Sequence, residues 1–426
     1  MNNYPKFSVI IPQKDRAEYL EHTLRTCMLQ DYPNFEIIVS DDCSEDNSVE
    51  VVTHLAKIDS RIHLFAHDHH LGMRDNFEFA LSQVIEGYVM ALGGDDGLLP
   101  GCIWRMYEIL QESGKQLLTW SAPLFHYSEN GKSIFAVKRR KNHKWRLIKS
   151  EDFLNKIAKT FHYQIDECPM FYMTGVASME LVNKVKSRTP DGCFYYCPTP
   201  DGFSGVVLAG EVEDYVYTDE PLSICGDTKK SQGKNYGRTD AKSRFESQQF
   251  FNDNIRRTMH KDLASQPYSP LTTLMTADYL LTARDLPGWP GKFKPFTMEE
   301  LLRAVFKQIS SSPYDNSVLV RELLIVREIA KQHTLLPLFE ELYNKTKRYK
   351  TYNTAIVGSA ITNSIRFEGS EFGINNIFDA AIATNFIVKS YQRISLKYII
   401  GILKNSFTIF LNSRRKKEIY NLPEID

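Results

Sequence analysis

Short apolar runs and helical stripes alternate over the first 125 residues of the chain. In the segments between the runs, apolar residues recur on one helical face, as Leu20, Leu24 and Met28 do in the first of them. Repeated β-α units of this length predict an α/β fold, in which helices cover a parallel sheet. The apolar runs, which have the length and β-branched character of buried parallel strands, lie at residues 7–11, 35–39, 62–65, 88–92 and 117–122.

The pattern is less regular between residues 126 and 240. Residues 175–185 predict a strand entering a helix, residues 192–205 are rich in Gly, Pro and Tyr and predict a loop, and residues 211–217 fit an edge strand. Residues 138–149 hold seven basic side chains and no acidic one. We interpret this run as a solvated loop, with binding of phosphates or acidic lipid head groups as the alternative.

Helical stripes dominate from about residue 240 onward. We therefore expect two domains, an α/β domain over 1–238 and an α-helical domain over 239–426 that serves membrane association or oligomerisation. Residues 389–417 carry eight basic side chains and no acidic one, interleaved with apolar residues. A basic amphipathic helix of this kind lies in a membrane interface. The alternative is an ordinary helix packed on its own domain.

Composition narrows the class of protein. The 426 residues are 42 % hydrophobic and 24 % charged, which excludes a largely disordered, collagen-like or disulfide-stapled chain. Lys+Arg and Asp+Glu are both 52, so a nucleic-acid partner is disfavoured. Seven cysteines are few for this length and favour a reduced compartment. Without a signal peptide or an uncharged apolar run of bilayer length, we expect a cytoplasmic protein, at most peripheral at the inner face of the cell membrane.

Acidic residues follow two of the predicted strands. Asp41 and Asp42 come after the second strand, and Asp95 and Asp96 after the fourth. The carboxyl ends of parallel strands form the ligand-binding edge of such a sheet, so these carboxylates are expected to gather there and to repel one another. A divalent cation, Mg²⁺ or Mn²⁺, offsets that repulsion and also binds phosphate oxygens. A further candidate, Asp201, lies in the predicted loop.

Several other kinds of site are disfavoured. No G-x-G-x-x-G follows the first strand, and no G-x-S-x-G is present, so a dinucleotide enzyme and a serine hydrolase are not expected. Cys193 and Cys197 have no second cysteine pair, which argues against zinc. The cluster at residues 67–70 (His-Asp-His-His) predicts a polar loop, because adjacent side chains rarely converge on one metal.

An ordered series of motifs resembles the family 2 glycosyltransferases. It consists of Ser-Val-Ile-Ile-Pro at 8–12, the stretch at 36–44 with its Asp-Asp pair, residues 71–76, and Leu-Gly-Gly-Asp-Asp-Gly-Leu-Leu-Pro at 92–100. The likeness is strong over about the first 115 residues and fainter to about 235. It implies the GT-A fold, a nucleotide-binding α/β domain with a mostly parallel central sheet, here followed by an α-helical C-terminal region.

The resemblance assigns roles at the nucleotide-sugar site. Pro12 would end the first strand beside the nucleotide, and Asp41 would hydrogen-bond the base, typically the uracil of a UDP-sugar. Arg74 occupies a position from which it would also contact the nucleotide. Asp95 would lie near the ribose or the sugar, and Asp96 would coordinate Mg²⁺ or Mn²⁺ on the diphosphate. The family's usual first aspartate of this motif is replaced by Gly93.

The resemblance also implies a catalytic base. Asp201 falls where the family commonly has a Glu-Asp pair, although Pro200 replaces the glutamate. The base would deprotonate an acceptor hydroxyl that attacks the anomeric carbon in a single, inverting displacement. Glu211, Glu213 and Asp214 are the alternatives for this role.

These expectations describe a metal-dependent, inverting glycosyltransferase of bacterial surface polysaccharide biosynthesis, such as O-antigen or capsule. Its donor would be a nucleotide sugar. The resemblance, together with the basic segment 389–417, implies that the acceptor is a lipid-linked glycan. Transfer to a protein or a soluble glycan is an alternative. A non-catalytic nucleotide-binding scaffold is a second, and helical stripes equally suit a dimerisation module, which would make the protein a homo-oligomer.

Overall fold

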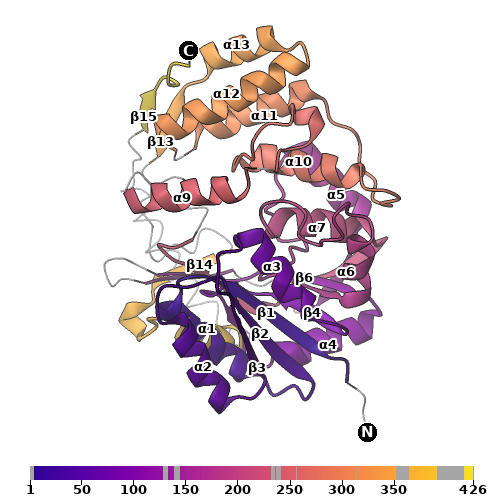
Figure 1. Ribbon diagram of the computed structural model, residues 1–426, viewed down its shortest axis with the longest axis vertical. Coiled ribbons are helices and arrows are strands. Elements are labelled where there is room, and N and C mark those ends of the chain that lie inside the picture. The colour runs from indigo at the N-terminus through magenta and orange to yellow at the C-terminus, as the bar shows by residue number, and fades with distance from the viewer. Residues whose placement is uncertain are drawn as a thin grey trace, which may run out of the picture.

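An eight-stranded sheet organises the first half of the chain in the computed structural model (Figure 1), which describes residues 4–127, 133–138, 144–231, 236, 241–255, 257–312, 314–351, 364–390 and 417–425. The strand order is β3-β2-β1-β4-β10-β6-β11-β9, and all strands except β10 and β9 point the same way. The predicted α/β class with a mostly parallel sheet is confirmed. The strands are β1 (Phe7–Gln13), β2 (Phe35–Asp41), β3 (Ile62–Ala66), β4 (Tyr88–Ala91), β6 (Leu117–Trp120), β9 (Trp145–Lys149), β10 (Gly175–Ser178) and β11 (Asp214–Thr218).

Helices cover both faces of this sheet. Because side chains alternate along a strand, Val9 and Ile11 of β1 pack into one core with α1, α2 and α4, whereas Ile10 packs into the other with α3, α5, α6 and α7. β1 is therefore apolar on both faces, which is why it reads as one continuous run. The helices are α1 (Ala17–Met28), α2 (Ser48–Ile58), α3 (Met73–Ser82), α4 (Cys102–Ser113), α5 (Ser150–Thr160), α6 (Met179–Lys186) and α7 (Asp201–Gly210).

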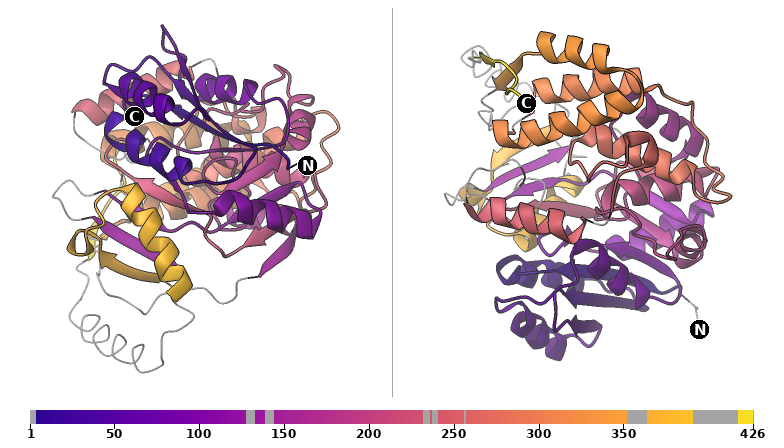
Figure 2. Two further views of the ribbon diagram at one scale, coloured as in Figure 1. Left: turned by 90° about the horizontal axis from the view of Figure 1, so that it is seen from below. Right: turned by 45° about the horizontal axis from the view of Figure 1, so that its top comes forward.

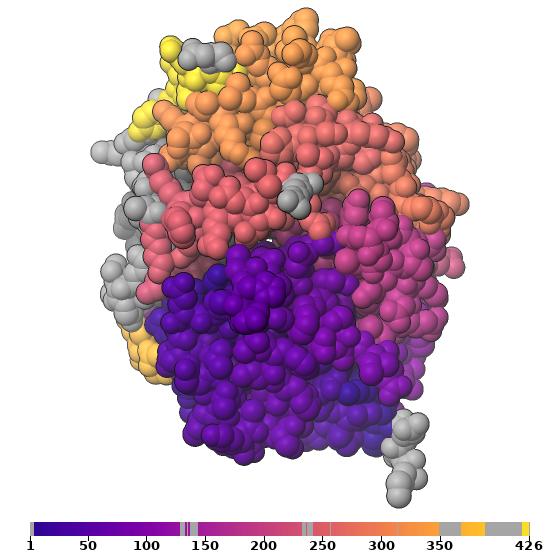
Figure 3. Space-filling view, in the orientation of Figure 1, coloured from indigo at the N-terminus to yellow at the C-terminus, as the bar shows by residue number. Residues whose placement is uncertain are grey.

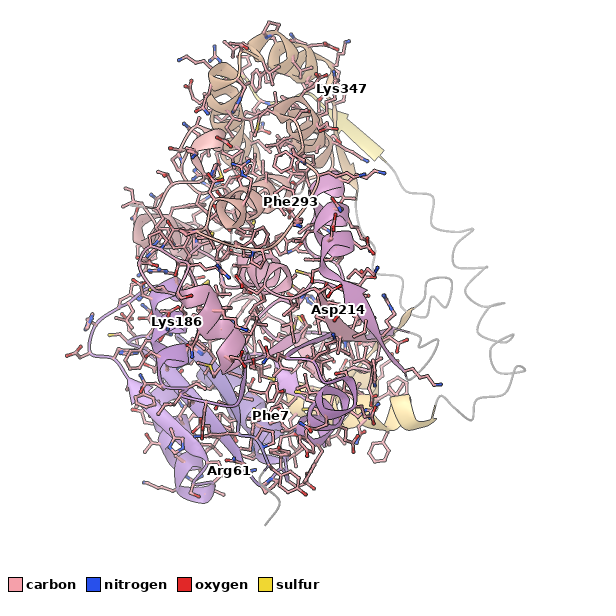
Figure 4. All side chains as sticks on the ribbon, turned by 90° about the vertical axis from the view of Figure 1, so that its right-hand side faces the viewer. Phe7, Arg61, Lys186, Asp214, Phe293 and Lys347 are labelled. Carbon is pink, nitrogen blue, oxygen red and sulfur yellow. The ribbon has the colours of Figure 1, made fainter. Side chains whose placement is uncertain are left out.

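A group of helices forms the other end of the molecule. In Figure 4, Phe7 and Arg61 lie at one end of the long axis and Lys347 lies at the opposite end. Helix α10 packs against α7 and joins this group to the α/β half. Among the described residues, no helix is long and apolar enough to cross a membrane. The elements are α9 (Ala241–Asp253), η1 (Lys261–Leu263), α10 (Thr272–Arg284), α11 (Met298–Ser310), α12 (Asn316–Gln332), α13 (Leu336–Lys345), and the paired strands β13 (Arg348–Thr351) and β15 (Lys417–Tyr420).

A segment near the C-terminus returns to the α/β half. It contributes β14 and α14, which lie beside strands from the first half of the chain (Figure 2). The predicted boundary at 238/239 stays a prediction, and residues 364–390 lie with the part that precedes it. Most of the basic segment 389–417 falls outside the described residues. The elements of this second, five-stranded sheet (order β14-β8-β7-β12-β5) and its surroundings are β5 (Gly97–Leu98), β7 (Leu124–His126), β8 (Ile134–Lys138), β12 (Ser223–Asp227), β14 (Ser364–Glu368), η2 (Ser370–Phe372) and α14 (Ile377–Ser390).

Four local predictions differ from the structure. The first strand continues through Pro12 to Gln13, since β1 and β2 pair as far as Gln13 and Asp41. Residues 211–217 do not form an edge strand, because β11 lies between β6 and β9. The part of 138–149 that the structure describes includes strand β9, which pairs with β11, rather than a loop.

The fourth difference is that α7 begins inside the predicted loop 192–205. Two glycines of α7 allow close packing against neighbouring side chains and do not form a turn. A Cβ on Gly202 would overlap the ring of Tyr279, and one on Gly210 would overlap the indole of Trp289. Both aromatic side chains belong to the helical group, so the sequence around α7 shows nothing of what makes glycine necessary there.

Replacing Ile377 by alanine is expected to lower the free energy of unfolding by about 2–5 kcal/mol, the usual cost of a large-to-small change in a core. Ile377 is completely buried at the start of α14, where its side chain faces Gly97 of β5. Denaturant unfolding would measure the loss. The matched control is Phe386→Ala on the same helix, which removes a side chain that is 68 % exposed and should change stability by less than about 0.5 kcal/mol. Equal effects would show that α14 is not part of the core.

Asp278 of α10 is expected to make stability fall as the pH rises. Burial raises the pKa of its carboxyl to about 7, against the hydrogen bond that the His260 N–H donates to it. Between pH 4 and 7 the folded chain therefore keeps a proton that the unfolded chain has released, and stability decreases across that window. Asp278→Asn removes this titrating group. The free energy of unfolding of the variant minus that of the unsubstituted chain should therefore increase by about 3 kcal/mol from pH 4 to pH 8.

Asp285→Asn is the control of opposite sign, because hydrogen bonds from Arg284 lower the pKa of Asp285. It should lose stability at neutral pH, where the ionised carboxylate is favoured in the folded chain, and lose less as the pH falls below 4. Chemical denaturation of the unsubstituted chain and both variants at pH 3, 4, 6 and 8 tests the pair. A stability difference for Asp278→Asn that does not change with pH would contradict the assignment.

Candidate active site

The carboxyl ends of β1 and β2 bring Gln13 and Asp41 side by side. The two residues are register partners, and Gln13 Nε2 donates a hydrogen bond to Asp41 Oδ2. The Ser44 N–H donates to Asp41 Oδ1 at 2.9 Å. Asp41 is 1 % exposed, and Gln13 Oε1 is buried with no hydrogen-bond partner among the described residues. A buried polar atom without a partner is costly, so this end of β1 offers an acceptor to a bound ligand.

The turn after β4 places the second acidic pair at the same edge. Asp95 Oδ2 accepts from Arg16 Nη1 at 2.8 Å and from the Thr228 hydroxyl at 2.9 Å. The two oxygens of Asp96 accept from the backbone N–H groups of Gly93 and Gly226, at 2.9 and 2.8 Å. Both carboxyls are buried, 5 % and 1 % exposed. The predicted gathering of Asp41, Asp95 and Asp96 at one sheet edge thus matches the positions that the structure gives them.

Burial and the neighbouring charge of Asp95 raise the pKa of Asp96 to about 7. The hydrogen bonds from Gly226 and Gly93 and the charge of Arg16 act in the other direction. Although burial opposes it, the charge of Asp95 raises the pKa of the Arg16 guanidinium. The two aspartates and Arg16 therefore form one electrostatic unit with a permanent positive charge inside it.

Three glycines allow this close arrangement. A Cβ on Gly93 would come within 2.6 Å of both Asp96 Oδ2 and the Tyr172 hydroxyl. A Cβ on Gly94 would meet the aliphatic part of the Arg16 side chain at 3.4 Å. At Gly226 a Cβ would overlap the backbone carbonyl of Asp95. The absence of a side chain at 93, where the family usually has an aspartate, thus agrees with the packing of its neighbours.

Helix α9 reaches this edge through the histidine cluster. His70 Nδ1 lies 2.8 Å from Asp42 Oδ2, and His70 Nε2 lies 3.0 Å from Asp253 Oδ2 at the end of α9. Figure 3 shows the residues of α9 as a strip across the face between the α/β half and the helical group. His67 instead pairs with the Ser40 hydroxyl. As predicted, residues 67–70 lie in a loop and make polar contacts.

The Arg74 guanidinium is already bound by other groups of the protein. It lies in α3, 8 % exposed, and its guanidinium donates to the carbonyl oxygen of Tyr195, to Asp75 and to Asp191. These contacts tie α3 to the segment before α7. Contact of Arg74 with a nucleotide stays a prediction, as does that of Pro12, which lies buried in β1.

Asp201 begins helix α7. Its Oδ2 accepts from the Tyr163 hydroxyl at 2.9 Å, and its Oδ1 is buried without a hydrogen-bond partner among the described residues. A negatively charged side chain at a helix N-terminus interacts favourably with the helix dipole. Tyr268 and Tyr279 also lie near Asp201. Burial is the main cause that raises the pKa of Tyr163, and the negative charge of Asp201 raises it further.

One short segment connects Asp201 with the acidic edge. The Phe171 N–H donates to the Ser204 hydroxyl on α7, and that hydroxyl donates to the Asp201 carbonyl oxygen. The next residue, Tyr172, places its hydroxyl beside Gly93 and Asp96. The start of α7 and the end of β4 therefore lie on either side of residues 171–172.

The alternative bases have other surroundings. Glu211, at the far end of α7, pairs with Arg188 Nε at 2.5 Å and its side chain is 1 % exposed. Asp214 begins β11 and pairs with Lys115, while Glu213 is exposed. Ten residues of helix separate Asp201 from Glu211, about 15 Å at 1.5 Å per residue.

The residues at this edge do not fit a divalent cation. Each oxygen of Asp96 already accepts a backbone N–H, and the Asp95 carboxylate is paired with Arg16. Within the described part of the chain, no three His, Cys, Asp or Glu side chains are grouped to hold a metal ion. Mg²⁺ and Mn²⁺ need several oxygen ligands, and the positive charge of the Arg16 guanidinium repels them. The predicted metal at Asp96 stays an expectation from the sequence.

Sequence reasoning missed the groups that complete the edge: Arg16, Thr228, Lys230, Tyr172 and Gly226. The Lys230 ammonium donates to the Asp15 carbonyl oxygen and lies 3.9 Å from Asp46. Arg16 follows the end of β1 by three residues, a position that signals a ligand-binding edge. Nothing in the sequence marks residues 226–230, because they reach the edge only through the pairing of β12 with β5 and β7.

The first part of the chain is similar to a known protein family. Residues 8–175 match the sequence model of glycosyl transferase family 2. The match and the mostly parallel sheet confirm the predicted GT-A α/β domain.

Two curated relatives carry names from polysaccharide assembly. A GalNAc(5)-diNAcBac-PP-undecaprenol beta-1,3-glucosyltransferase of Campylobacter jejuni is 39 % identical over 109 residues, which are 25 % of this chain and 35 % of the relative. The putative teichuronic acid biosynthesis glycosyltransferase TuaG of Bacillus subtilis is 31 % identical over 113 residues, 26 % of this chain and 45 % of the relative. The chain thus spans less than half the length of either. The crystal structure of S. aureus TarS 1-349 with UDP-GlcNAc is similar over 82 % of this chain and 95 % of that one, with 15 % identity and a TM-score of 0.42.

Proposed function

We propose that the chain transfers a sugar from a nucleoside diphosphate sugar, UDP-linked, to a hydroxyl of a lipid-linked glycan in surface polysaccharide biosynthesis. The family 2 match over 8–175 and the names of the two relatives support this class of reaction. The observation that carries the proposal is the edge itself, where Asp41 and Gln13 lie at the ends of β2 and β1 and the Asp95–Asp96 turn follows β4. Parallel α/β sheets bind nucleotides at this edge.

The proposed mechanism is a single displacement with inversion. Asp201 takes the proton of the acceptor hydroxyl, whose oxygen forms the new bond to the anomeric carbon. The bond from that carbon to the diphosphate oxygen breaks, and its electron pair leaves with the nucleoside diphosphate. Tyr163 supports this role because its hydroxyl holds Asp201 Oδ2 and leaves Oδ1 for the acceptor. No side-chain nucleophile is required.

Asp201 is the base that the geometry favours over its rivals. Residues 171–172 connect its helix end with the Asp96 turn, whereas Glu211 is committed to Arg188 and Asp214 to Lys115. Glu213 is exposed and lies beyond the far end of α7.

The proposal is tested by incubating the purified chain with nucleotide sugars and a lipid-linked or short glycan acceptor. We expect release of UDP coupled to formation of a glycan one sugar longer, and proton NMR of the product would show the inverted anomeric configuration. Absence of product with every UDP-sugar, together with transfer from a GDP-sugar, would correct the donor. A retained configuration would overturn the mechanism.

We also propose that the protein meets its acceptor at the inner face of the cell membrane. The support is the basic, apolar-interleaved composition of residues 389–417. Self-association through the helical group stays a prediction.

A further inference from the structure

Two cationic side chains occupy the edge at which the resemblance expects a metal. Arg16 comes from the loop between β1 and α1, and Lys230 comes from the turn after β12. Arg16 Nη1 contacts Asp95 Oδ2 at 2.8 Å, and Nη2 donates to the Lys230 carbonyl oxygen at 2.8 Å. The side chains are only 20 % and 24 % exposed. Two loops far apart in sequence thus hold two positive charges together beside the Asp95–Asp96 turn.

The other carboxylates at this edge already have partners. Asp15 Oδ1 accepts from the Glu45 N–H at 2.7 Å. Asp46 accepts from the N–H of Ala17 at 3.1 Å and from Ser48. Asp42 accepts from the N–H groups of residues 71 and 72 and pairs with His70. These carboxylates hold the loops in place, so the edge does not depend on a cation to offset their charge.

The glycines fit this arrangement. Gly94 lies against the Arg16 stem and leaves room for it, and Gly93 leaves room for Asp96 and the Tyr172 hydroxyl. A third carboxylate at residue 93 would strengthen a metal site, but the structure has no space for a side chain there.

We infer that Arg16 and Lys230 bind the diphosphate of the donor directly and supply the positive charge that the resemblance assigns to a divalent cation. The inference rests on the proposed function and deepens it. A planar guanidinium binds two phosphate oxygens at once, and an ammonium binds them as a point charge. Fixed cations at the leaving diphosphate stabilise the charge that develops there as the sugar departs.

Calorimetric titration of UDP into the full chain, in EDTA and in Mn²⁺, tests the inference. We expect the dissociation constant of the unsubstituted chain to differ by less than about threefold between the two buffers. Arg16→Gln keeps a hydrogen-bond donor for Asp95 but removes the charge, and should weaken UDP binding at least tenfold in EDTA. Mn²⁺ should restore part of the loss in this variant alone, because Asp95 loses its cationic partner. A purely structural role of Arg16 would not produce that rescue.

Two further variants sharpen the result. Lys230→Gln should weaken UDP binding in EDTA about tenfold while keeping the melting temperature, since Lys230 lies on a turn. Arg105→Gln is the matched control. Arg105 of α4 pairs with Glu108 on the same helix and with Glu220 after β11, so its replacement should leave UDP binding unchanged.

Each outcome decides between named possibilities. UDP binding that requires Mn²⁺ in the unsubstituted chain overturns the inference and leaves the proposed function intact. Binding of neither UDP nor GDP in either buffer contradicts the proposed function and the inference with it. Unchanged binding in Arg16→Gln and Lys230→Gln overturns the role of these two residues.

Discussion

Replacing Asp201 by asparagine is expected to lower kcat by about 10²- to 10⁴-fold, the usual contribution of a positioned general base. The substitution keeps the size of the side chain and an oxygen that accepts from the Tyr163 hydroxyl, so the fold should be preserved. It removes the group that takes the acceptor proton. Donor binding should change little, because Asp201 lies at the start of α7 and not at the ends of β1 and β2. Initial rates of UDP release with saturating acceptor measure the loss.

The rival bases provide the controls for this prediction. Glu213→Gln changes an exposed carboxylate and should leave kcat within about twofold. Glu211→Gln breaks the ion pair with Arg188, so it should lower the melting temperature more than the rate. If Asp201→Asn keeps its rate while one of the others loses it, the base has been assigned to the wrong end of α7.

Replacing Gly93 by aspartate is expected to lower transfer by about 100-fold, although it restores the aspartate that the family usually has there. Its Cβ alone would lie 2.6 Å from Asp96 Oδ2 and from the Tyr172 hydroxyl, well inside normal contact. Overpacking costs about 1–3 kcal/mol, and a shift of about 1 Å at reacting groups costs about 10²-fold in rate. A third buried carboxylate beside Asp95 and Asp96 adds repulsion. Kinetics with UDP-sugar, in EDTA and in Mn²⁺, measure the effect.

A second-site change separates packing from charge in this prediction. Gly93→Ala adds only the Cβ, and Tyr172→Phe removes one of the two atoms that it meets. The double variant should therefore recover part of the loss of Gly93→Ala. Gly94→Ala on the same turn meets side-chain carbons of Gln13 and Arg16 at 3.3 and 3.4 Å, longer than the 2.6 Å contacts at residue 93, and should be affected less. A Gly93→Asp variant more active in Mn²⁺ than the unsubstituted chain would show that the turn accepts a metal site.

The parts of the fold that the sequence predicts are those that depend on neighbours along the chain. β1 is recognisable as a buried strand because Val9, Ile10 and Ile11 are consecutive apolar residues. They pack into the two hydrophobic cores on opposite faces of the sheet. The carboxyl edge follows from strand direction, so Asp41 and Asp96 could be placed near one another before any contact was known.

The errors concern residues whose environment comes from elsewhere in the chain. Gly202 and Gly210 resemble loop residues in the sequence, yet they lie in α7 against Tyr279 and Trp289. The strand at 211–217 is not an edge strand, because residues 145–149, assigned to a solvated loop, pair with it instead.

The sequence by itself thus determined the class of this protein, an α/β domain with acidic residues at the carboxyl edge of its sheet, because strand periodicity and strand-end motifs are local. Only the tertiary structure decided what surrounds that edge. It brought Arg16, Thr228 and Lys230 together over more than 200 residues of chain and packed α14 against the α/β half. Contacts between residues so far apart in sequence depend on how the strands pair and on where two backbone segments can approach closely. A local pattern of side chains contains neither kind of information.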